Sequence, residues 1–506
     1  MERFIAVRRM PTLLAAGTLL AANAFLAAPA QAQVPAAASA QVKWEEGFDN
    51  PAAALPVALT GYTGLHGELY TAAADWLPPA SGGASRCNGW VLGAGATSPA
   101  ADAQCGANGG RYVINTGTGG TSTLTAWGFL RRMAVVMGTA QGIAGNNAVA
   151  SLSNGTGATQ NQTTTLQLSI ADIGSYPGAF TPEPGHFYVA SAMFAAIHCN
   201  ADAPYSGATP TWNDPQENIH LVANGARVGA LQTASNICPA GLTQTTPPRA
   251  YVPPALPNVV PAPGYYPYPD SPNNTGAGNV FVATLYSEPY LFQLGDSLGL
   301  EINNSQLSGL ANDVAFDKLQ IWDVTPALYK SFDAADPDNS LHGAIVTGGT
   351  GQLTFVIVNT AEGFAKNGLS FTDFLPNGVT IASPAGMTNT CGGTVAAAPG
   401  GTQIELTGGS LAAGAAECRI SVNVTAAAAG VYENDVGLAT GARGTVTKNG
   451  LVPAQGPARL TVTNPPPGPV AGAGATPVPT LDARSLALLT LLMLGALAWR
   501  MRRARG

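Results

Sequence analysis

Ser297 has a sequence context that suggests a nucleophile. It lies in the tetrapeptide Gly295-Asp296-Ser297-Leu298. A nucleophilic serine needs a base that takes its proton, an acid that orients the base, and donors that stabilise the oxyanion. The only histidine after it is His342, in the segment DNSLH. One distant histidine is therefore the only candidate base downstream.

The tetrapeptide resembles the nucleophile motif of the GDSL lipases and esterases. That resemblance implies an α/β fold, with the motif near the mature N-terminus before a helix and an Asp-x-x-His near the end. Here the motif is followed by LGLEINNS, which alternates like a β-strand, and Asp338 precedes His342 at a different spacing. We interpret Gly295-Asp296 as a turn before a strand. We predict no catalytic residue and no enzyme, with a secreted hydrolase as a third alternative.

The remaining histidines offer little support for a metal site. His186 and His198 have the same parity on one expected strand, but an extended strand would separate them by about 40 Å. They could share an ion only if the strand broke. Separate histidines, each with its own partner, are the simpler interpretation.

The chain between its two ends has the pattern of an all-β protein. Only 10% of its residues are charged, and short β-branched or alternating runs are separated by Gly, Asn and Pro turns. Helical segments with paired charges are hard to find. This pattern is typical of β-sandwiches.

The first domain, residues 42–325, opens with VKWEEGFDNPAAALPVALTGY and closes with LGDSLGLEINNSQLSGLANDVAFDKLQIWDV. These two ends resemble the opening and closing strands of jelly-roll sandwiches in secreted bacterial proteins. HFYVASAMFAAIHC between them predicts a central strand with Cys199 in the core. Asn224-Gly225 predicts a type I′ turn in a hairpin.

The jelly-roll resemblance also implies a structural calcium ion between the first and last strands. Calcium requires several oxygen ligands. The carboxylates in these positions are Glu46, Asp49, Asp313 and Asp317. Ordinary strand-end carboxylates are the alternative interpretation.

Residues 243–276 form an insertion with ten prolines. Proline cannot donate to a sheet ladder, so the segment cannot be a central strand. We interpret it as an extended surface excursion. Tyr265, Tyr266 and Tyr268 would then be exposed, either as padding or as stacking surfaces for a glycan or protein.

The second domain, residues 327–464, contains the alternating strand GQLTFVIVNTA, with Leu353, Phe355 and Ile357 on one face. Its FTDFLPNGV, CGGTV, GGSLAAGAAECRISVNV and VYENDV segments resemble a repeat domain of unknown function in bacterial surface proteins. That resemblance implies an immunoglobulin-like sandwich that acts as a spacer. The whole chain is therefore predicted to be a jelly-roll-like sandwich followed by an immunoglobulin-like sandwich.

All six cysteines lie between the two terminal segments, residues 1–32 and 481–506, which are predicted below to direct export and sorting. An even number of cysteines in an oxidising compartment favours disulfides. Six cysteines allow 15 pairings. The domain boundary separates the last two from the rest, and the resemblance implies a cysteine pair there. The simplest scheme pairs neighbours: Cys87–Cys105, Cys199–Cys238 and Cys391–Cys418.

The N-terminus predicts export. Residues 1–32 combine three arginines, an apolar stretch and the cleavage pattern Ala30-Gln31-Ala32, which together indicate a signal peptide. A retained N-terminal helix is the alternative.

The C-terminus predicts a sorting or anchoring tail. A Pro/Gly-rich linker, residues 465–480, leads to residues 481–506, with an apolar helix and four final arginines that should stay cytoplasmic. Pro479, Thr480 and Leu481 resemble the motif of bacterial IPTL-CTERM tails. That resemblance implies recognition by an exosortase-type membrane enzyme, with an uncleaved membrane anchor as the alternative.

Charge and composition limit the partners. The chain has 22 basic and 29 acidic residues; eight of the basic and two of the acidic residues lie in the terminal segments, which leaves the body at 14 against 27. This acidity argues against nucleic acid. We expect a non-enzymatic structural or adhesion protein at the cell surface, with a surface protein or glycan as partner. A carbohydrate-binding module, braced by calcium and using Trp127, Trp212 and the three tyrosines, is the alternative.

Overall fold

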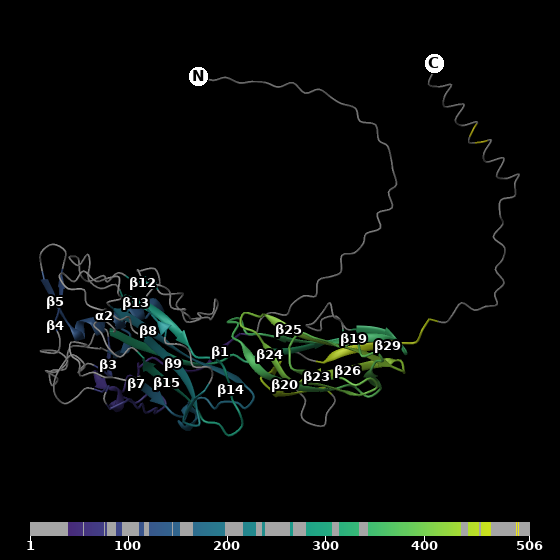
Figure 1. Cartoon of the computed structure of the whole chain (residues 1–506), viewed down its shortest axis with the longest axis horizontal. Coiled ribbons are helices and arrows are strands. Elements are labelled where there is room, and N and C mark those ends of the chain that lie inside the picture. The colour runs from purple at the N-terminus through teal and green to yellow at the C-terminus, as the bar shows by residue number, and fades with distance from the viewer. Residues whose placement is uncertain are drawn as a thin grey trace, which may run out of the picture.

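The chain forms two β-sandwiches that lie end to end in the computed structural model (Figure 1). The structure describes residues 39–53, 55–74, 76–77, 88–93, 111–115, 121–143, 145–151, 165–197, 216–228, 235–237, 264–266, 280–305, 313–332, 343–436, 444–454, 457–466, 492 and 494. The all-β prediction is confirmed: both sandwiches are built from antiparallel sheets with few parallel pairs.

The first sandwich packs a nine-stranded sheet on a five-stranded sheet. The larger sheet has the order β12-β13-β8-β16-β6-β3-β2, with β1 on β16 and β14 on β8. Its strands are β1 (Gln41–Glu46), β2 (Val57–Ala58), β3 (Trp90–Gly93), β6 (Asn147–Ser151), β8 (Phe187–Ile197), β12 (Gly264–Tyr266), β13 (Val280–Tyr286), β14 (Tyr290–Leu291) and β16 (Asp313–Asp323).

The smaller sheet has the order β10-β9-β15-β7, with β11 on β9. Its strands are β7 (Thr165–Ile170), β9 (Gln216–Ala223), β10 (Ala226–Val228), β11 (Ser235–Asn236) and β15 (Leu298–Asn304). The short elements outside the two sheets are the hairpin β4 (Arg111–Asn115) and β5 (Thr121–Thr125), and the 3-10 turns η1 (Leu59–Gly61) and η3 (Ile173–Ser175).

The opening and closing strands of the first sandwich pair with one another. Strand β1 runs antiparallel to β16, with Trp44 opposite Ile321. The central strand β8 also pairs with β16 along most of its length. The β9–β10 turn has positive φ at Asn224 (53°) and Gly225 (73°), as a type I′ turn requires.

Helix α2 (Ala126–Gln141) was not expected. It contacts β8, β13 and β16, and it buries Met133, Val136 and Met137. The residue pattern gives no clear signal for this helix, because its apolar residues are not accompanied by paired charges and resemble those of the buried strands around it. Trp127 therefore lies in a helix, although its side chain is outside the described part.

The proline-rich insertion contributes a strand to the described structure. Residues 264–266 form β12 at the edge of the larger sheet, with Tyr265 opposite Phe281. An edge position agrees with the exclusion of a central strand. The side chains of Tyr265 and Tyr266, and all of Tyr268 and Trp212, lie outside the described residues, so their exposure stays a prediction.

The second sandwich packs a six-stranded sheet on a seven-stranded sheet. The first has the order β21-β25-β19-β17-β28, with β22 on β25, and the second has the order β18-β29-β26-β27-β20-β24-β23. The strands are β17 (Ala327–Ser331), β18 (Gly343–Val346), β19 (Thr350–Val358), β20 (Lys366–Phe374), β21 (Val379–Ile381), β22 (Thr388–Asn389), β23 (Thr394–Ala396), β24 (Gln403–Leu411), β25 (Glu417–Ala426), β26 (Gly430–Val436), β27 (Gly444–Asn449), β28 (Val452–Pro453) and β29 (Ala458–Thr463).

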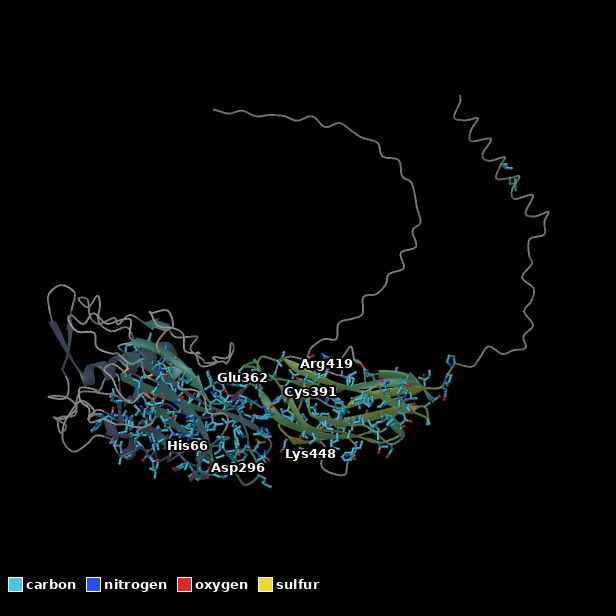
Figure 2. The ribbon with its side chains drawn as sticks, in the orientation of Figure 1. His66, Asp296, Glu362, Cys391, Arg419 and Lys448 are labelled. Carbon is cyan, nitrogen blue, oxygen red and sulfur yellow. A yellow bond between two sulfur atoms is a disulfide. The ribbon has the colours of Figure 1, made fainter. Side chains whose placement is uncertain are left out.

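A disulfide joins Cys391 to Cys418, as expected for this domain. Figure 2 labels Cys391 within the second sandwich. The other two predicted pairs, Cys87–Cys105 and Cys199–Cys238, involve residues outside the described part.

The predicted targeting segments also lie outside the described residues, except for Leu492 and Leu494. Within the described ranges, no helix combines the length and the apolar character needed to cross a bilayer.

Candidate functional site

The most distinctive site joins the two sandwiches. Strand β16 ends at Asp323 and β17 begins at Ala327, so only Val324, Thr325 and Pro326 connect them, and all three are buried. The Val324 amide donates to the Phe187 carbonyl at 2.9 Å, and the Pro326 carbonyl accepts from the Val452 amide at 3.0 Å. The connection is therefore bonded to both sandwiches and is not a free linker.

A single hydrophobic core crosses this joint. Phe187, Val189, Tyr286 and Trp322 belong to the first sandwich, but they are buried in the same cluster as the core of the second. The rings of Tyr286 and Phe364 have centroids 6.0 Å apart. Because separating the sandwiches would expose these side chains to water, the joint should resist bending.

Gly450 lies where the two sandwiches are in direct contact. Its amide donates to the Gly185 carbonyl at 2.7 Å. A Cβ atom at this position would lie 2.5 Å from Cε2 of Phe187 and 2.9 Å from Cδ2 of Leu369. The backbone is also at a positive φ of 71°. Only glycine satisfies both conditions.

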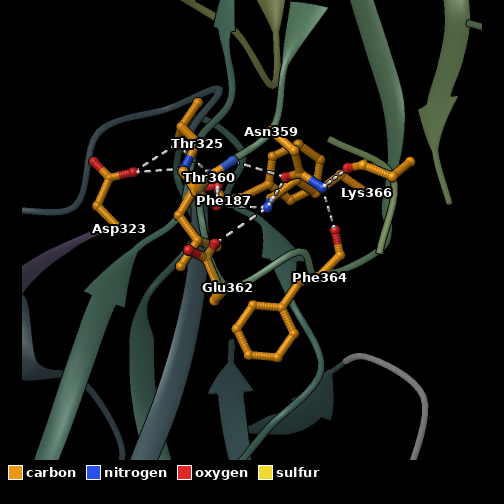
Figure 3. A network of polar contacts seen from close by, with 10 residues as sticks. Phe187, Asp323, Thr325, Asn359, Thr360, Glu362, Phe364 and Lys366 are labelled. Atoms are coloured by element: carbon orange, nitrogen blue, oxygen red, sulfur yellow. Dashed lines mark hydrogen bonds and ion pairs between the residues drawn. The ribbon is translucent and has the colours of Figure 1, made fainter. Parts of the chain in front are cut away.

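A buried polar network lies beside this core (Figure 3). The ammonium of Lys366 donates to Asn359 Oδ1 and to Thr360 Oγ1, and it pairs with Glu362 Oε1 at 3.3 Å. Thr360 Oγ1 donates in turn to the Val324 carbonyl at 3.3 Å, which ties the network to the connection. Burial lowers the pKa of Lys366 to about 8, although Glu362 opposes the shift. Glu362 is labelled where the sandwiches meet in Figure 2.

His186 and Asp323 form a second polar group at the joint. Nδ1 of His186 lies 2.8 Å from Asp323 Oδ2, and Thr325 Oγ1 donates to Asp323 Oδ1 at 2.6 Å. The hydrogen bond to Asp323 raises the pKa of His186 despite partial burial. Burial acts to raise the pKa of Asp323, but these hydrogen bonds outweigh it and hold the pKa below its usual value.

The other histidines in the described structure also have partners of their own. His66 lies 2.8 Å from Glu68 Oε1, and His220 Nε2 lies 3.1 Å from Asn303 Oδ1. His198 is outside the described residues, so the shared histidine site stays untested.

The Gly295-Asp296-Ser297-Leu298 motif leads from β14 into β15 and is hydrogen-bonded to the turn between β9 and β10. Ser297 Oγ accepts from the Asn224 amide, and the Ser297 amide donates to Asn224 Oδ1, both at 3.0 Å. Asp296 accepts from Asn224 Nδ2 at 2.8 Å and from the Tyr290 hydroxyl at 2.7 Å. Strand β15 begins at Leu298, so the predicted turn before a strand is confirmed. Figure 2 labels Asp296 in the first sandwich.

The four carboxylates predicted to bind calcium are brought together only in part. Glu46 is buried and accepts from the Phe48 amide and from the hydroxyls of Tyr62 and Tyr70. The side chain of Asp313 is outside the described part. Across the residues that the structure describes, no group of three or more His, Cys, Asp or Glu side chains could hold a metal ion.

Asp49 and Asp317 do lie near one another. A Cβ on Gly47 would be 3.0 Å from Asp49 Oδ2 and 4.0 Å from Asp317 Oδ1. Asp317 Oδ2 accepts from Gln141 Nε2 at 2.9 Å, while its buried Oδ1 meets no donor. Burial raises the pKa of Asp317 to about 7. An oxygen of this kind is a natural ligand for a cation.

Comparison with known proteins matches the second sandwich alone to a family. Residues 326–462 match the family described as "Domain of unknown function (DUF7933)". The match covers nearly all of the domain that the sequence predicted at residues 327–464, and it is again to a domain of unknown function. No curated protein matches the chain.

Two solved structures show a distant similarity. One is the C-terminal domain of the AgI/II polypeptide BspA of Streptococcus agalactiae, at 11% identity and a TM-score of 0.17, covering 62% of this chain and 96% of the other. The second, titled "BspA_C_WT", gives 10% identity and the same TM-score, covering 62% of this chain and 97% of the other. At this level of similarity neither supports a functional conclusion.

Proposed function

We propose that this protein is an exported, non-enzymatic structural or adhesion protein that displays its first sandwich on a rigid spacer at the cell surface. The joint is the observation that supports this proposal most strongly. Three buried connecting residues, a shared core and a buried polar network all hold the two sandwiches in one orientation. A fixed orientation suits a protein that presents one face outward.

The ends of the chain complete the proposal. The signal sequence at residues 1–32 would direct export, and residues 481–506 would be anchored in the membrane or processed at Pro479-Thr480-Leu481 by an exosortase-type enzyme. The mass of the protein isolated from membranes distinguishes the two outcomes, because processing removes the arginine-rich end.

Surface display can be tested on intact cells. An epitope tag inserted at the exposed turn Asn224-Gly225 should be labelled by an antibody without lysis. A tag placed after Gly506 should be labelled only after lysis, or should be missing if the tail is cleaved. Labelling of the Asn224-Gly225 tag only in lysed cells would contradict the proposal.

We also propose a bracing calcium ion held by Asp49 and Asp317. The unpartnered Oδ1 of Asp317 supports this second proposal. Calcium takes about six to eight oxygen ligands, so backbone or solvent oxygens must complete the shell. Glu46 is not included because three donors already bond to it.

Thermal unfolding tests the calcium proposal. Calcium should raise the unfolding temperature of the exported chain relative to a chelator, and Asp317→Asn should abolish the increase. Asp172→Asn is the control, because Asp172 is a half-buried carboxylate that caps the 3-10 turn η3, far from Asp49 and Asp317 in the sequence. An equal unfolding temperature with calcium and with chelator would contradict it. A glycan screen under both conditions would test the carbohydrate-binding alternative.

A further inference from the structure

A second buried lysine lies inside the second sandwich. The side chain of Lys330 is 0% exposed, and it extends from β17 in the six-stranded sheet toward the seven-stranded sheet. Its Nζ donates to Asp373 Oδ1 at 3.0 Å, to Asn434 Oδ1 at 2.9 Å and to Thr445 Oγ1 at 2.9 Å, and also to the Asp435 carbonyl. An ammonium has three hydrogens, so it cannot satisfy all four oxygens at once.

The three side chains around Lys330 come from neighbouring strands. Asn434, Thr445 and Asp373 lie on β26, β27 and β20, which are adjacent in the sheet, and all three are buried. Asp373 contacts both of the other groups: its Oδ2 accepts from Asn434 Nδ2 at 2.8 Å, and its Oδ1 accepts from Thr445 Oγ1 at 2.6 Å. An amine, a carboxamide and a carboxylate are therefore in mutual contact, away from water.

These three groups have the chemistry needed to form an amide bond. Since a carbonyl bond is about 1.2 Å long, Nζ of Lys330 lies within about 4 Å of Cγ of Asn434. Burial lowers the pKa of Lys330, although Asp373 opposes the shift, which favours the uncharged and nucleophilic amine. Holding the reactants in contact removes much of the entropic barrier to a slow reaction.

We propose that Lys330 and Asn434 become joined by an intramolecular isopeptide bond, with Asp373 as the proton carrier. A proton passes from the ammonium to Asp373, which leaves a neutral amine and a neutral acid. The amine attacks Cγ of Asn434, while the acid donates a proton toward the carboxamide. The attacking nitrogen gives its surplus proton to the Asp373 carboxylate, the C–N bond to Nδ2 breaks, and the protonated nitrogen leaves as ammonia. The net change is amine plus carboxamide to secondary amide plus ammonia. No oxidant or further reactant is needed.

Both Asn434 and Asp373 contact Lys330, but Asn434 is the acceptor because Asp373 is placed to transfer protons. The Asp373 oxygens contact the amine, the leaving nitrogen and the Thr445 hydroxyl, which is the position of a group that moves protons between them. The resulting bond would connect β17 to β26, which belong to opposite sheets. The two bonded residues are 104 positions apart in the chain. A covalent bond between the sheets would keep the second sandwich from opening under tension. This property is separate from the fixed orientation on which the spacer role rests.

Lys366 provides a matched comparison within the same domain. It is equally buried and also contacts an asparagine oxygen, that of Asn359, and a carboxylate. Both hydrogens on Nδ2 of Asn359, however, donate to backbone carbonyls, those of Phe364 at 3.1 Å and Ala415 at 2.9 Å. Its leaving nitrogen is therefore bonded to the backbone and not to an acid, and we expect no bond there.

Peptide mapping of the mature, reduced protein tests the proposal. An amide at Lys330 blocks tryptic cleavage there, so residues 319–366 should be recovered linked to residues 420–443, at about 17 Da below the sum of the two peptides. The linked peptide is the readout, and the mass of the intact protein is not. An N-terminal glutamine that cyclises also loses ammonia and would lower the intact mass by the same amount. Neither peptide contains Cys391 or Cys418, so the disulfide cannot produce the link.

Variants assign the roles. Asp373→Ala and Asn434→Ala should each give separate peptides, whereas Lys366→Met should retain the link between the segments around Lys330 and Asn434. Separate peptides from the unmodified protein would overturn the proposal whether or not any variant folds. An amide between Lys330 and Asp373 would instead form with loss of water. A linked peptide that contains Asp373, at about 18 Da below the summed mass of its two parts, would therefore overturn the choice of Asn434 as acceptor.

Discussion

Replacing Gly450 by alanine should destabilise the protein through the joint. The change adds a Cβ that would meet Phe187 of the first sandwich at 2.5 Å and Leu369 of the second at 2.9 Å. Such overpacking costs about 1–3 kcal/mol. The positive φ of 71° adds about 1–2 kcal/mol for any residue with a Cβ. We therefore expect Gly450→Ala to lower the free energy of unfolding by about 3 kcal/mol.

Gly348→Ala separates the two costs. Gly348 has nearly the same φ, 72°, but a Cβ there would meet nothing within 4 Å. It should therefore lose only the backbone contribution, about 1 kcal/mol. Urea-induced unfolding of both variants, followed by circular dichroism, gives the difference. If Gly450→Ala is no more destabilising than Gly348→Ala, the sandwiches are not packed as tightly as the joint requires.

Three further predictions concern separate parts of the molecule. Replacing Cys391 and Cys418 by serine opens a loop with a sequence separation of 27 and should cost about 3 kcal/mol in urea unfolding, and an unchanged midpoint would contradict this. Burial raises the pKa of Glu217 to about 8, above the ordinary 4.5 of the unfolded chain, so its contribution to stability falls as the pH rises between these values. Glu217→Gln should therefore be about 4 kcal/mol more stable than the unmodified protein at pH 8 and equal to it at pH 4, and equal stability at both pH values would show that Glu217 is not held protonated. Ser297→Ala should cost about 1 kcal/mol by removing the acceptor for the Asn224 amide, and loss of a genuine ester-hydrolysing activity in this variant would contradict the structural role of the motif.

Much of the strand architecture could be predicted from the residue pattern. The alternation in LGLEINNS placed Leu298, Leu300 and Ile302 together, and all three are buried in the core of the first sandwich. Asn224-Gly225 predicted its turn because positive φ at both positions suits few other residue pairs. In these cases the local pattern and the tertiary structure agree.

The polar core of the second sandwich was missed, although the sequence contained a signal for it. Lys330 shares its strand parity with the apolar residues Leu328 and Phe332, and Asp373 shares its parity with Phe371. A charged residue on the inward face of a strand is unusual and requires a partner. That partner came from strands far along the chain, which spacing within one segment could not reveal. The joint was missed for the same reason, since Gly450 and Phe187 meet only in the folded protein.

The orientation of the two sandwiches is the central claim, and a distance measurement tests it most directly. Spin labels on non-natural amino acids at Leu294 and Met387, which are 87% and 46% exposed and lie on different sandwiches, avoid the native cysteines. Pulsed electron–electron double resonance should then give one narrow distance distribution, and Gly450→Ala should broaden it. A broad distribution in the unmodified protein would mean that the sandwiches move independently, and it would contradict the rigid spacer.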